Sequence, residues 1–150
     1  MKDIILIFGL PGSGKTTLSS MLKNMLPHCI HLNADEIRSK FNDWDFSKQG
    51  RLRQCNRMKQ LANEAATRFV ICDFVCPTIE FRKHFDASYV IWCNTLGESR
   101  YSDTNKIFET PSSSDCNLIV NSFEKMKDAA MQVQNYFFYK YKSEESSISL

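Results

Sequence analysis

The sequence predicts an α/β fold: a parallel β-sheet of about five strands flanked by helices on both faces. Short apolar runs alternate along the chain with segments of helical pattern, and this alternation is typical of crossover units in a parallel sheet. The first run, DIILIFGL at 3–10, is apolar throughout, as expected of a strand that is buried on both faces. Since 150 residues, 43% of them hydrophobic, suffice for one substantial core, we expect a single domain.

The other elements follow from the same patterning. Further apolar runs predict strands at 28–32, 68–74, 88–93 and 117–121. Helical patterns cover most of the intervals, at 15–26, 34–41, 47–67, 79–86 and 122–139. The polar segment 95–115 interrupts this rhythm and is interpreted as a long functional loop, because a strand pattern resumes after it. The domain is expected to span 1–140, and the polar end, 141–150, to form a disordered tail.

The bulk composition restricts the classes of partner. The formal charge of +2, from 19 basic and 17 acidic residues, provides no general electrostatic reason to expect a nucleic-acid or membrane partner. No apolar run approaches the roughly 20 residues that span a bilayer, and the N-terminus lacks the basic start of a cleavable signal. The six cysteines and three histidines show no metal-ligand spacing, so we expect reduced thiols in a cytoplasmic protein.

A glycine-rich turn follows the first strand. GLPGSGKTT fits the pattern GxxxxGKT between a buried strand and a helix, which is the context that a phosphate-binding P-loop requires. Backbone N–H groups and the helix N-terminus attract phosphate oxygens, Lys15 reaches the outer phosphates, and Thr16 can ligate Mg²⁺ directly. The sequence therefore predicts a single-domain P-loop NTPase fold whose cofactors are ATP and Mg²⁺. The predicted ATP-binding residues are Gly9, Pro11, Gly12, Ser13, Gly14, Lys15, Thr16 and Thr17.

A missing motif narrows the class of P-loop protein. A GTPase is expected to carry NKxD, and the nearest stretch, NKIF at 105–108, lacks the aspartate. A P-loop at the start of a short chain instead indicates a small-molecule kinase. Such an enzyme transfers the γ-phosphoryl group of the nucleotide in line to an acceptor hydroxyl.

The stretch HLNADEIRSKF at 31–41 supplies candidate acceptor residues at the end of a predicted strand, where ligands bind in open α/β sheets. Asn33 and Glu36 have the spacing of a helix N-cap with its reciprocal partner. Asp35 and Arg38 share one helix face, so they form either an intrahelical ion pair or a base and an anion contact that face the acceptor. We favour the second interpretation because of the position at the strand end.

The helix at 47–67 offers a second cation. Arg51 and Gln54 project on the side of its apolar stripe, whereas Arg53 and Arg57 project elsewhere and are expected to be solvated. An inward arginine in the first turn of a helix is disfavoured by the helix dipole and by desolvation. Arg51 is therefore predicted to meet an anion.

Two further positions have competing interpretations. Trp44 and Phe46 precede the helix and are either stacking surfaces for a base or core residues. Asp73 ends the apolar run FVICD in the manner of a Walker B aspartate, which holds Mg²⁺ through water or assists as a base. The alternative for Asp73 is a buried aspartate that caps the next turn.

With these pieces placed, most of residues 1–125 resembles adenylylsulfate (APS) kinase, which phosphorylates the 3′-hydroxyl of adenosine 5′-phosphosulfate to make PAPS. GLPGSGKTTL is the shared P-loop, and NADEIR stands where the family has DGDxxR. DWDFSKQGRLRQCNR is similar to the family's DLGFSxxDRxENxRR. FVCP stands where the family has FISP, and YSDTNKIFETP is similar to FTGIDSPYEAP. Five segments in the same order make the resemblance more specific than the P-loop alone.

The resemblance implies a role for each matching position. Asp35 takes the place of the family's catalytic aspartate, acting beside Lys15 of the P-loop. Arg38 and Arg51 match two arginines that contact APS, and Phe46 matches the ring that packs on the adenine. Gln54 stands at a position where the family has asparagine. The remaining substrate-binding positions lie beside the nucleotide, at Val75, Cys76 and the flanking aromatic Tyr101. The implied partner is the small-molecule nucleotide APS. Family members are commonly dimers, so a homodimer is implied as well.

The chain departs from the family at three places. Asn33 replaces the first aspartate of the acidic motif, and Cys76 replaces a serine that is phosphorylated in some members. The basic lid of the family is almost absent, because only LGESR joins NT to YSDTN and leaves Arg100 as its cation. A lid excludes water and neutralises charge at the transferring phosphate, so slow turnover or a different acceptor is expected.

A second resemblance remains as an alternative. IILIFGLPGSGKTTL, LNADEIR and ICDFVCPTIEFRKHF are also similar to phage-type polynucleotide 5′-kinase, which has a strand-end aspartate corresponding to Asp73. The helix GRLRQCNR, the loop IFETP and the small basic excess favour APS kinase over this alternative. A third interpretation is an ATP-binding protein that has lost catalysis together with its lid.

Overall fold

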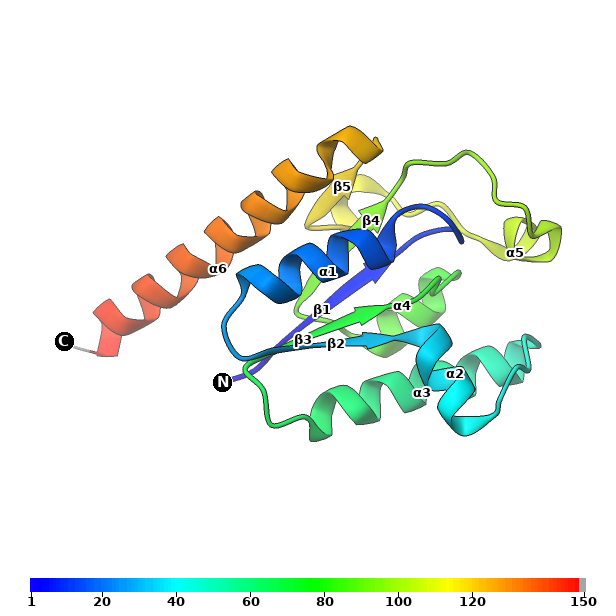
Figure 1. Cartoon of the computed structure of the whole chain (residues 1–150), viewed down its shortest axis with the longest axis horizontal. Helices are drawn as coiled ribbons and strands as arrows, with labels where there is room; N and C mark the ends of the chain where they lie inside the picture. Colours follow the sequence, from blue (N-terminus) through cyan, green and yellow to red (C-terminus); the bar gives the residue numbers. More distant parts are fainter. Residues whose placement is uncertain (149–150) are drawn as a thin grey trace.

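Five parallel strands form the centre of the structure, a computed structural model that describes residues 1–148 (Figure 1). The strand order is β2-β3-β1-β4-β5, and every neighbouring pair is parallel. The strands are β1 (Asp3–Phe8), β2 (Cys29–Asn33), β3 (Phe69–Asp73), β4 (Tyr89–Cys93) and β5 (Leu118–Val120). The predicted α/β fold with a five-stranded parallel sheet is confirmed.

Helices cover both faces of the sheet. They are α1 (Lys15–Met25), α2 (Ala34–Phe41), α3 (Lys48–Glu64), α4 (Ile79–Phe85), α5 (Ser102–Ile107) and α6 (Met126–Ile148), with 3₁₀ turns η1 (Ser113–Asp115) and η2 (Phe123–Lys125). Successive side chains of a strand point to opposite faces. Ile5 and Ile7 of β1 accordingly pack in one core cluster with residues of α1 and α6, whereas Leu6 and Phe8 pack in the other with residues of α3 and α4. The uninterrupted apolar run of β1 follows from this double burial.

The structure differs from the expectation in two segments. The stretch 95–115, expected to be a loop, contains α5 and η1. The stretch 141–148, expected to be a disordered tail, continues α6 as far as Ile148; residues 149 and 150 lie outside the described part of the chain. The tail was misjudged because its polar composition hides an anchor, Tyr141, whose hydroxyl donates a hydrogen bond to the buried carboxylate of Asp3.

The aromatic cluster at 136–141 divides between the core and the surface. Phe137 is buried against Phe69, while Phe138 and Tyr139 are 60% and 67% exposed. The homodimer stays a prediction, and the aromatic side chains of α6 that an interface would use are the exposed ones. No helix within the described residues 1–148 is long and apolar enough to cross a membrane.

The topology predicts a ligand site between β1 and β3. After β1 the chain crosses to β2 on one side of β1, and after β3 it crosses to β4 on the other side. Such a reversal opens a crevice beyond the carboxyl ends of the strands, which is where ligands bind in open α/β sheets. The ends of β1 and β3 are neighbours there, because Ile7 pairs with Asp73.

Candidate active site

The P-loop connects β1 to α1 and leaves the first turn of α1 open. No side chain caps the helix at Gly14, so its first backbone N–H groups remain available to an anion. Gly14 has φ +94°, and a Cβ at this position would lie 2.6 Å from Cε of Met126. Only glycine therefore fits at the end of this loop, which preserves the open helix N-terminus.

Lys15 follows the glycine-rich turn, and its side chain folds back over that turn. Its Nζ donates a hydrogen bond to the carbonyl oxygen of Leu10 at 3.0 Å. Burial lowers the pKa of the Lys15 ammonium, and the negative charge of Asp73 acts in the opposite direction. A partly buried cation held beside free N–H groups favours the binding of phosphate.

Asp73 receives three hydrogen bonds on one carboxylate oxygen. Thr16 Oγ1 lies 2.9 Å from Oδ2, His31 Nε2 lies 3.0 Å from it, and Asn33 Nδ2 lies 3.1 Å from it. Asp73 is only 2% exposed. These three partners lie on α1 and β2, and none lies in the turn that follows β3. Such contacts are expected of a residue in the binding site, and a residue that caps the next turn would bind that turn instead.

Sequence reasoning missed His31 and the second role of Asn33. The two residues are two positions apart on β2 and therefore point to the same face of the sheet. The parallel register pairs Asn33 with Asp73, which brings that face to the end of β3. The alternation was visible in the sequence, but the position of β2 beside β3 was not.

On the acceptor side, the N-cap of α2 forms as predicted: Asn33 Oδ1 accepts a hydrogen bond from the backbone N–H of Glu36 at 3.0 Å. Asp35 is exposed and borders the cavity, and within residues 1–148 it forms no ion pair with Arg38. Arg38 is 4% exposed, and its Nη1 donates to the carbonyl oxygens of Asp43 and Asp45 at 3.0 and 3.1 Å. The ion-pair interpretation of Asp35 and Arg38 is therefore wrong.

Phe46 lies beside both predicted substrate arginines. The Cζ atoms of Arg38 and Arg51 are 4.3 and 5.3 Å from its ring centroid. Arg51 also donates from Nε to the carbonyl oxygen of Phe46 at 2.9 Å. Phe46 and Trp44 are each 51% exposed, so the interpretation of these two side chains as core residues is wrong.

Of the two outward arginines of α3, Arg53 is exposed as expected, with a side chain that is 48% exposed, and Arg57 is not. Arg57 was expected to be solvated, but its side chain is 16% exposed and donates to Asp43 Oδ2 and Gln54 Oε1, both at 3.1 Å. Gln54 in turn donates to the carbonyl oxygen of Ala34 at 3.0 Å. The helical projection failed for Arg57 because the segment between α2 and α3 folds back over that side of α3.

One cavity of about 1390 Å³ joins the P-loop to the acceptor side. The predicted site residues that line it are Pro11, Gly12, Gly14, Lys15, Thr16, Thr17, Asp35, Arg38, Phe46, Arg51, Gln54, Asp73, Val75, Cys76 and Tyr101. Gly9 and Ser13 are buried behind this lining. Cys76 borders the cavity although it is only 1% exposed, because it packs in the same core cluster as Cys55.

The short lid segment LGESR, residues 96–100, is held by the side chain of Asn105. The sequence drew attention to Asn105 only because the stretch NKIF lacks the aspartate of NKxD. Its side chain accepts from the backbone N–H of Ser99 and donates to the Ser99 carbonyl oxygen, both at 2.8 Å. Arg100 donates to the hydroxyl of Tyr101 at 2.9 Å. Arg51 Nη2 reaches Thr104 Oγ1 at 3.5 Å and so connects α3 with α5 across the cavity.

Comparisons with known proteins give the chain its relatives. The adenylylsulphate kinase family model matches residues 1–91. The structure of the Mycobacterium tuberculosis APS kinase CysC in complex with AMPPNP and APS superposes with a TM-score of 0.74 at 17% identity, covering 89% of this chain and 96% of that chain. The structure of APE1195 superposes with a TM-score of 0.75 at 20% identity, covering 90% of this chain and 94% of that chain.

Other kinases share the same fold. Shikimate kinase from Acinetobacter baumannii superposes with a TM-score of 0.59 at 19% identity, covering 93% of this chain and 95% of that chain. At such identities the structural matches show the fold alone, and no curated protein matches the sequence. The family model spans more than half of the chain, and the fold is that of the P-loop kinases. The chain belongs to the adenylylsulphate kinase family.

Proposed function

We propose that the protein transfers the γ-phosphoryl group of ATP to the 3′-hydroxyl of adenosine 5′-phosphosulfate, giving ADP and PAPS. The observation that carries the proposal is the single cavity that joins Lys15 of the P-loop to Asp35, Arg38 and Arg51. Its volume of about 1390 Å³ exceeds that of a usual single-ligand pocket, roughly 300–1,000 Å³. A kinase needs such room because donor and acceptor are bound together for an in-line transfer.

The donor side fits ATP with Mg²⁺. The open N-terminus of α1 and the ammonium of Lys15 would bind the phosphates. The Thr16 hydroxyl and the Asp73 carboxylate are hard oxygen donors, 2.9 Å apart, of the kind that Mg²⁺ prefers. Mg²⁺, when bound by these groups and the nucleotide, supplies charge neutralisation at the phosphates. His31 and Asn33 orient Asp73 for this role.

The acceptor side fits an anionic nucleotide with a free hydroxyl. The Asp35 carboxylate would accept the proton of the 3′-hydroxyl as its oxygen bonds to the γ-phosphorus and ADP leaves. Arg38 and Arg51 would hold the phosphosulfate, and the exposed part of the Phe46 ring would contact the adenine. No carboxylate pairs with either arginine among the described residues, so both guanidiniums remain available to an anion.

A polynucleotide or nucleoside-hydroxyl kinase is the second candidate. Asp73, which the APS kinase motifs do not account for, lies in contact with the P-loop through Thr16. The short lid segment also leaves Tyr101 47% exposed at the acceptor side, which suits a larger substrate. A third candidate, an ATP-binding protein without catalysis, would retain the P-loop and show no transfer.

A panel of acceptors, assayed for ADP release with ATP and Mg²⁺, separates the three candidates. APS is expected to give ADP and PAPS in equal amounts. Turnover of a 5′-hydroxyl oligonucleotide with no reaction of APS would favour the second candidate. ATP binding by calorimetry without transfer to any acceptor would favour the third.

A further inference from the structure

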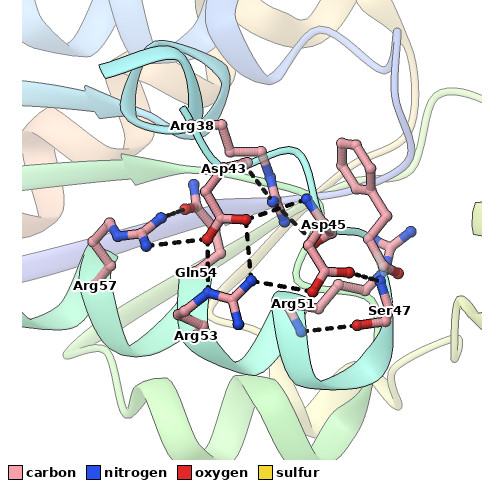
Figure 2. Close-up of polar contacts among 10 residues, drawn as sticks. Arg38, Asp43, Asp45, Ser47, Arg51, Arg53, Gln54 and Arg57 are labelled. Atoms are coloured by element: carbon pink, nitrogen blue, oxygen red, sulfur yellow. Dashed lines mark hydrogen bonds and ion pairs between the residues drawn. The ribbon is translucent and has the colours of Figure 1, made fainter. Parts of the chain in front are cut away.

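The segment that joins α2 to α3, residues Asp43 to Ser47, is held against α3 by a group of ion pairs (Figure 2). We call this segment the 43–47 turn. Arg53 donates from Nε to Asp43 Oδ2 at 2.7 Å and from Nη2 to Asp43 Oδ1 and Asp45 Oδ2, both at 3.1 Å. Arg57 adds a bond to Asp43 Oδ2. Two carboxylates of the turn thus meet two guanidiniums of α3.

The same carboxylates also bind the main chain of the turn. Asp43 Oδ1 accepts from the backbone N–H of Asp45 at 3.2 Å, and Asp45 Oδ1 accepts from that of Ser47 at 2.9 Å. The hydrogen bonds from Arg53 in particular lower the pKa of Asp43, and those with Ser47 lower the pKa of Asp45, so both groups stay charged near neutral pH. The turn is therefore fixed by two sets of bonds, one to the arginines of α3 and one between its own carboxylates and backbone N–H groups.

Gly50, in the first turn of α3, allows this close packing. A Cβ at Gly50 would lie 2.2 Å from the carbonyl oxygen of Asp45 and 2.5 Å from its Cγ. Both distances are well below a normal van der Waals contact. Any larger side chain at this position must displace the turn.

The 43–47 turn carries the groups that face the acceptor. The carbonyl oxygens of Asp43 and Asp45 hold the guanidinium of Arg38, and Phe46 follows directly. The carbonyl oxygen of Phe46 holds Nε of Arg51. A displacement of the turn would therefore move both arginines and the ring together.

The family motif has a different pattern at these positions. Aligned on DLGFSxxDRxENxRR, this chain has Asp45 in place of glycine, Gly50 in place of aspartate and Arg53 in place of glutamate. Glycine and aspartate have thus changed places at two positions that touch in the structure. The third change supplies the cation that binds the relocated carboxylate.

We propose that Asp45, Gly50 and Arg53 are a coupled set of positioning residues that hold Arg38, Phe46 and Arg51 in place for the acceptor nucleotide. The proposal rests on the proposed function only for the identity of that acceptor. None of the three is expected to touch the reacting atoms, so their loss should weaken acceptor binding and leave ATP binding unchanged.

The test compares Gly50→Asp, Asp45→Gly, the double variant and Arg53→Ala by steady-state kinetics with APS and ATP. Gly50→Asp is expected to raise the KM for APS about tenfold, and Arg53→Ala about fivefold, with the KM for ATP within about twofold. In the double variant, which has the family's residues at both positions, the contact with Cγ of Asp45 is gone and glycine at position 45 lets the backbone move away from the new Cβ. Its KM for APS is therefore expected to return to within about threefold of the wild type. Gln60→Ala removes an exposed hydrogen bond on the same helix and serves as the control.

Trp44 provides a readout that needs no acceptor. The chain has two tryptophans, so Trp92→Phe leaves Trp44 as the only reporter within the turn. In that background, Gly50→Asp and Arg53→Ala are expected to lower the fluorescence anisotropy of Trp44 and to increase its quenching by iodide, while the double variant reverses part of the change. Arg53→Ala, with a side chain that is 48% exposed, keeps the test independent of whether Gly50→Asp folds.

The two proposals fail in distinguishable ways. If the wild type binds ATP but does not phosphorylate APS, the proposed function is wrong, and the Trp44 measurements alone decide on the positioning set. Unchanged Trp44 signals in folded Gly50→Asp and Arg53→Ala would overturn the positioning role. So would equal effects on the KM for APS and for ATP, or a double variant whose defects simply add.

Discussion

At the scale of single residues, the contacts of Asp73 explain why Asn33 stands where the family has an aspartate. Asn33 uses its amide oxygen to cap α2 and its amide nitrogen to bind Asp73. An aspartate could keep the cap but would face the Asp73 carboxylate at about the same distance, 3.1 Å. In this chain the end of β3 supplies the carboxylate of the site, and the end of β2 supplies an amide.

Asn33→Asp is predicted to destabilise the protein by about 1–2 kcal/mol, because it replaces a hydrogen bond by a like-charge contact. Mg²⁺ should recover much of this loss, since a divalent cation favours paired carboxylates. Thermal unfolding with and without Mg²⁺ measures both effects. Asn33→Ser, which keeps a capping oxygen without adding a charge, should lose stability without gaining a response to Mg²⁺.

Asp35→Asn is predicted to lower the rate of phosphoryl transfer by a factor of about 10² or more, because the amide cannot accept the proton of the acceptor hydroxyl. The carboxylate of Asp35 is exposed and forms no hydrogen bond with the side chains or backbone of residues 1–148, so its loss should leave the fold and the affinity for ATP unchanged. Glu36→Gln on the same helix is the matched control and should retain activity. Lys15→Ala, in contrast, should weaken both transfer and ATP binding. Single-turnover assays together with ATP titrations separate these outcomes.

At the scale of elements, the anchoring of α6 depends on a polar cluster at the amino end of β1. Asp3 is 2% exposed, and its carboxylate accepts hydrogen bonds from Lys140 at 3.0 Å and from Tyr141. Cζ of Arg68 lies 3.6 Å from the ring centroid of Tyr141. A buried carboxylate that loses one donor is costly, so the last turns of α6 matter to the whole domain.

Tyr141→Phe is predicted to lower the free energy of unfolding by about 1–2 kcal/mol at neutral pH. Burial, together with the hydrogen bond to Asp3, raises the pKa of Tyr141 in the folded state. A raised pKa means that the stabilising term is complete below the unfolded value, about 10, and is lost as the pH rises through the folded value. The melting temperature of the wild type should therefore fall more steeply above pH 10, roughly, than that of the Phe variant. Tyr139→Phe, on the exposed side of α6, should match the wild type.

Elements set by local rules were predictable from the sequence, and those set by distant partners were not. The strand DIILIFGL, the P-loop and the Asn33 cap each depend on neighbouring residues, and all three formed as predicted. The contact of His31 with Asp73 depends on the strand order, which no local pattern encodes. Arg57 was misplaced for a similar reason, because the 43–47 turn that covers it comes from outside its helix.

At the scale of the whole molecule, the six cysteines are distributed through the core on both sides of the sheet. All six are free, four are buried, and Cys29 and Cys116 are partly exposed. Burial raises the pKa of both partly exposed thiols to about 11. The thiols therefore contribute as packing groups and are protected from reagents by the fold as a whole.

Thiol labelling is predicted to report on unfolding of the entire domain. At pH 8, roughly, a thiol with a raised pKa should react on the order of a hundredfold more slowly than a free cysteine, because little thiolate is present. In denaturant all six thiols should react at once with a chromogenic disulfide reagent. Rapid native-state labelling of any of the four buried thiols would show that part of the sheet opens independently.

The contact at Gly50 also bears on how this chain and its relatives are connected by single mutations. Exchanging Asp45 first gives glycine at both positions, which removes a contact with Arg53 and creates no clash. Exchanging Gly50 first gives aspartate at both positions, with a new Cβ 2.5 Å from Cγ of Asp45, a contact that glycine at position 45 does not have. A lineage that moves between the two patterns is therefore expected to pass through the double-glycine sequence, so the structure predicts the order of the two mutations.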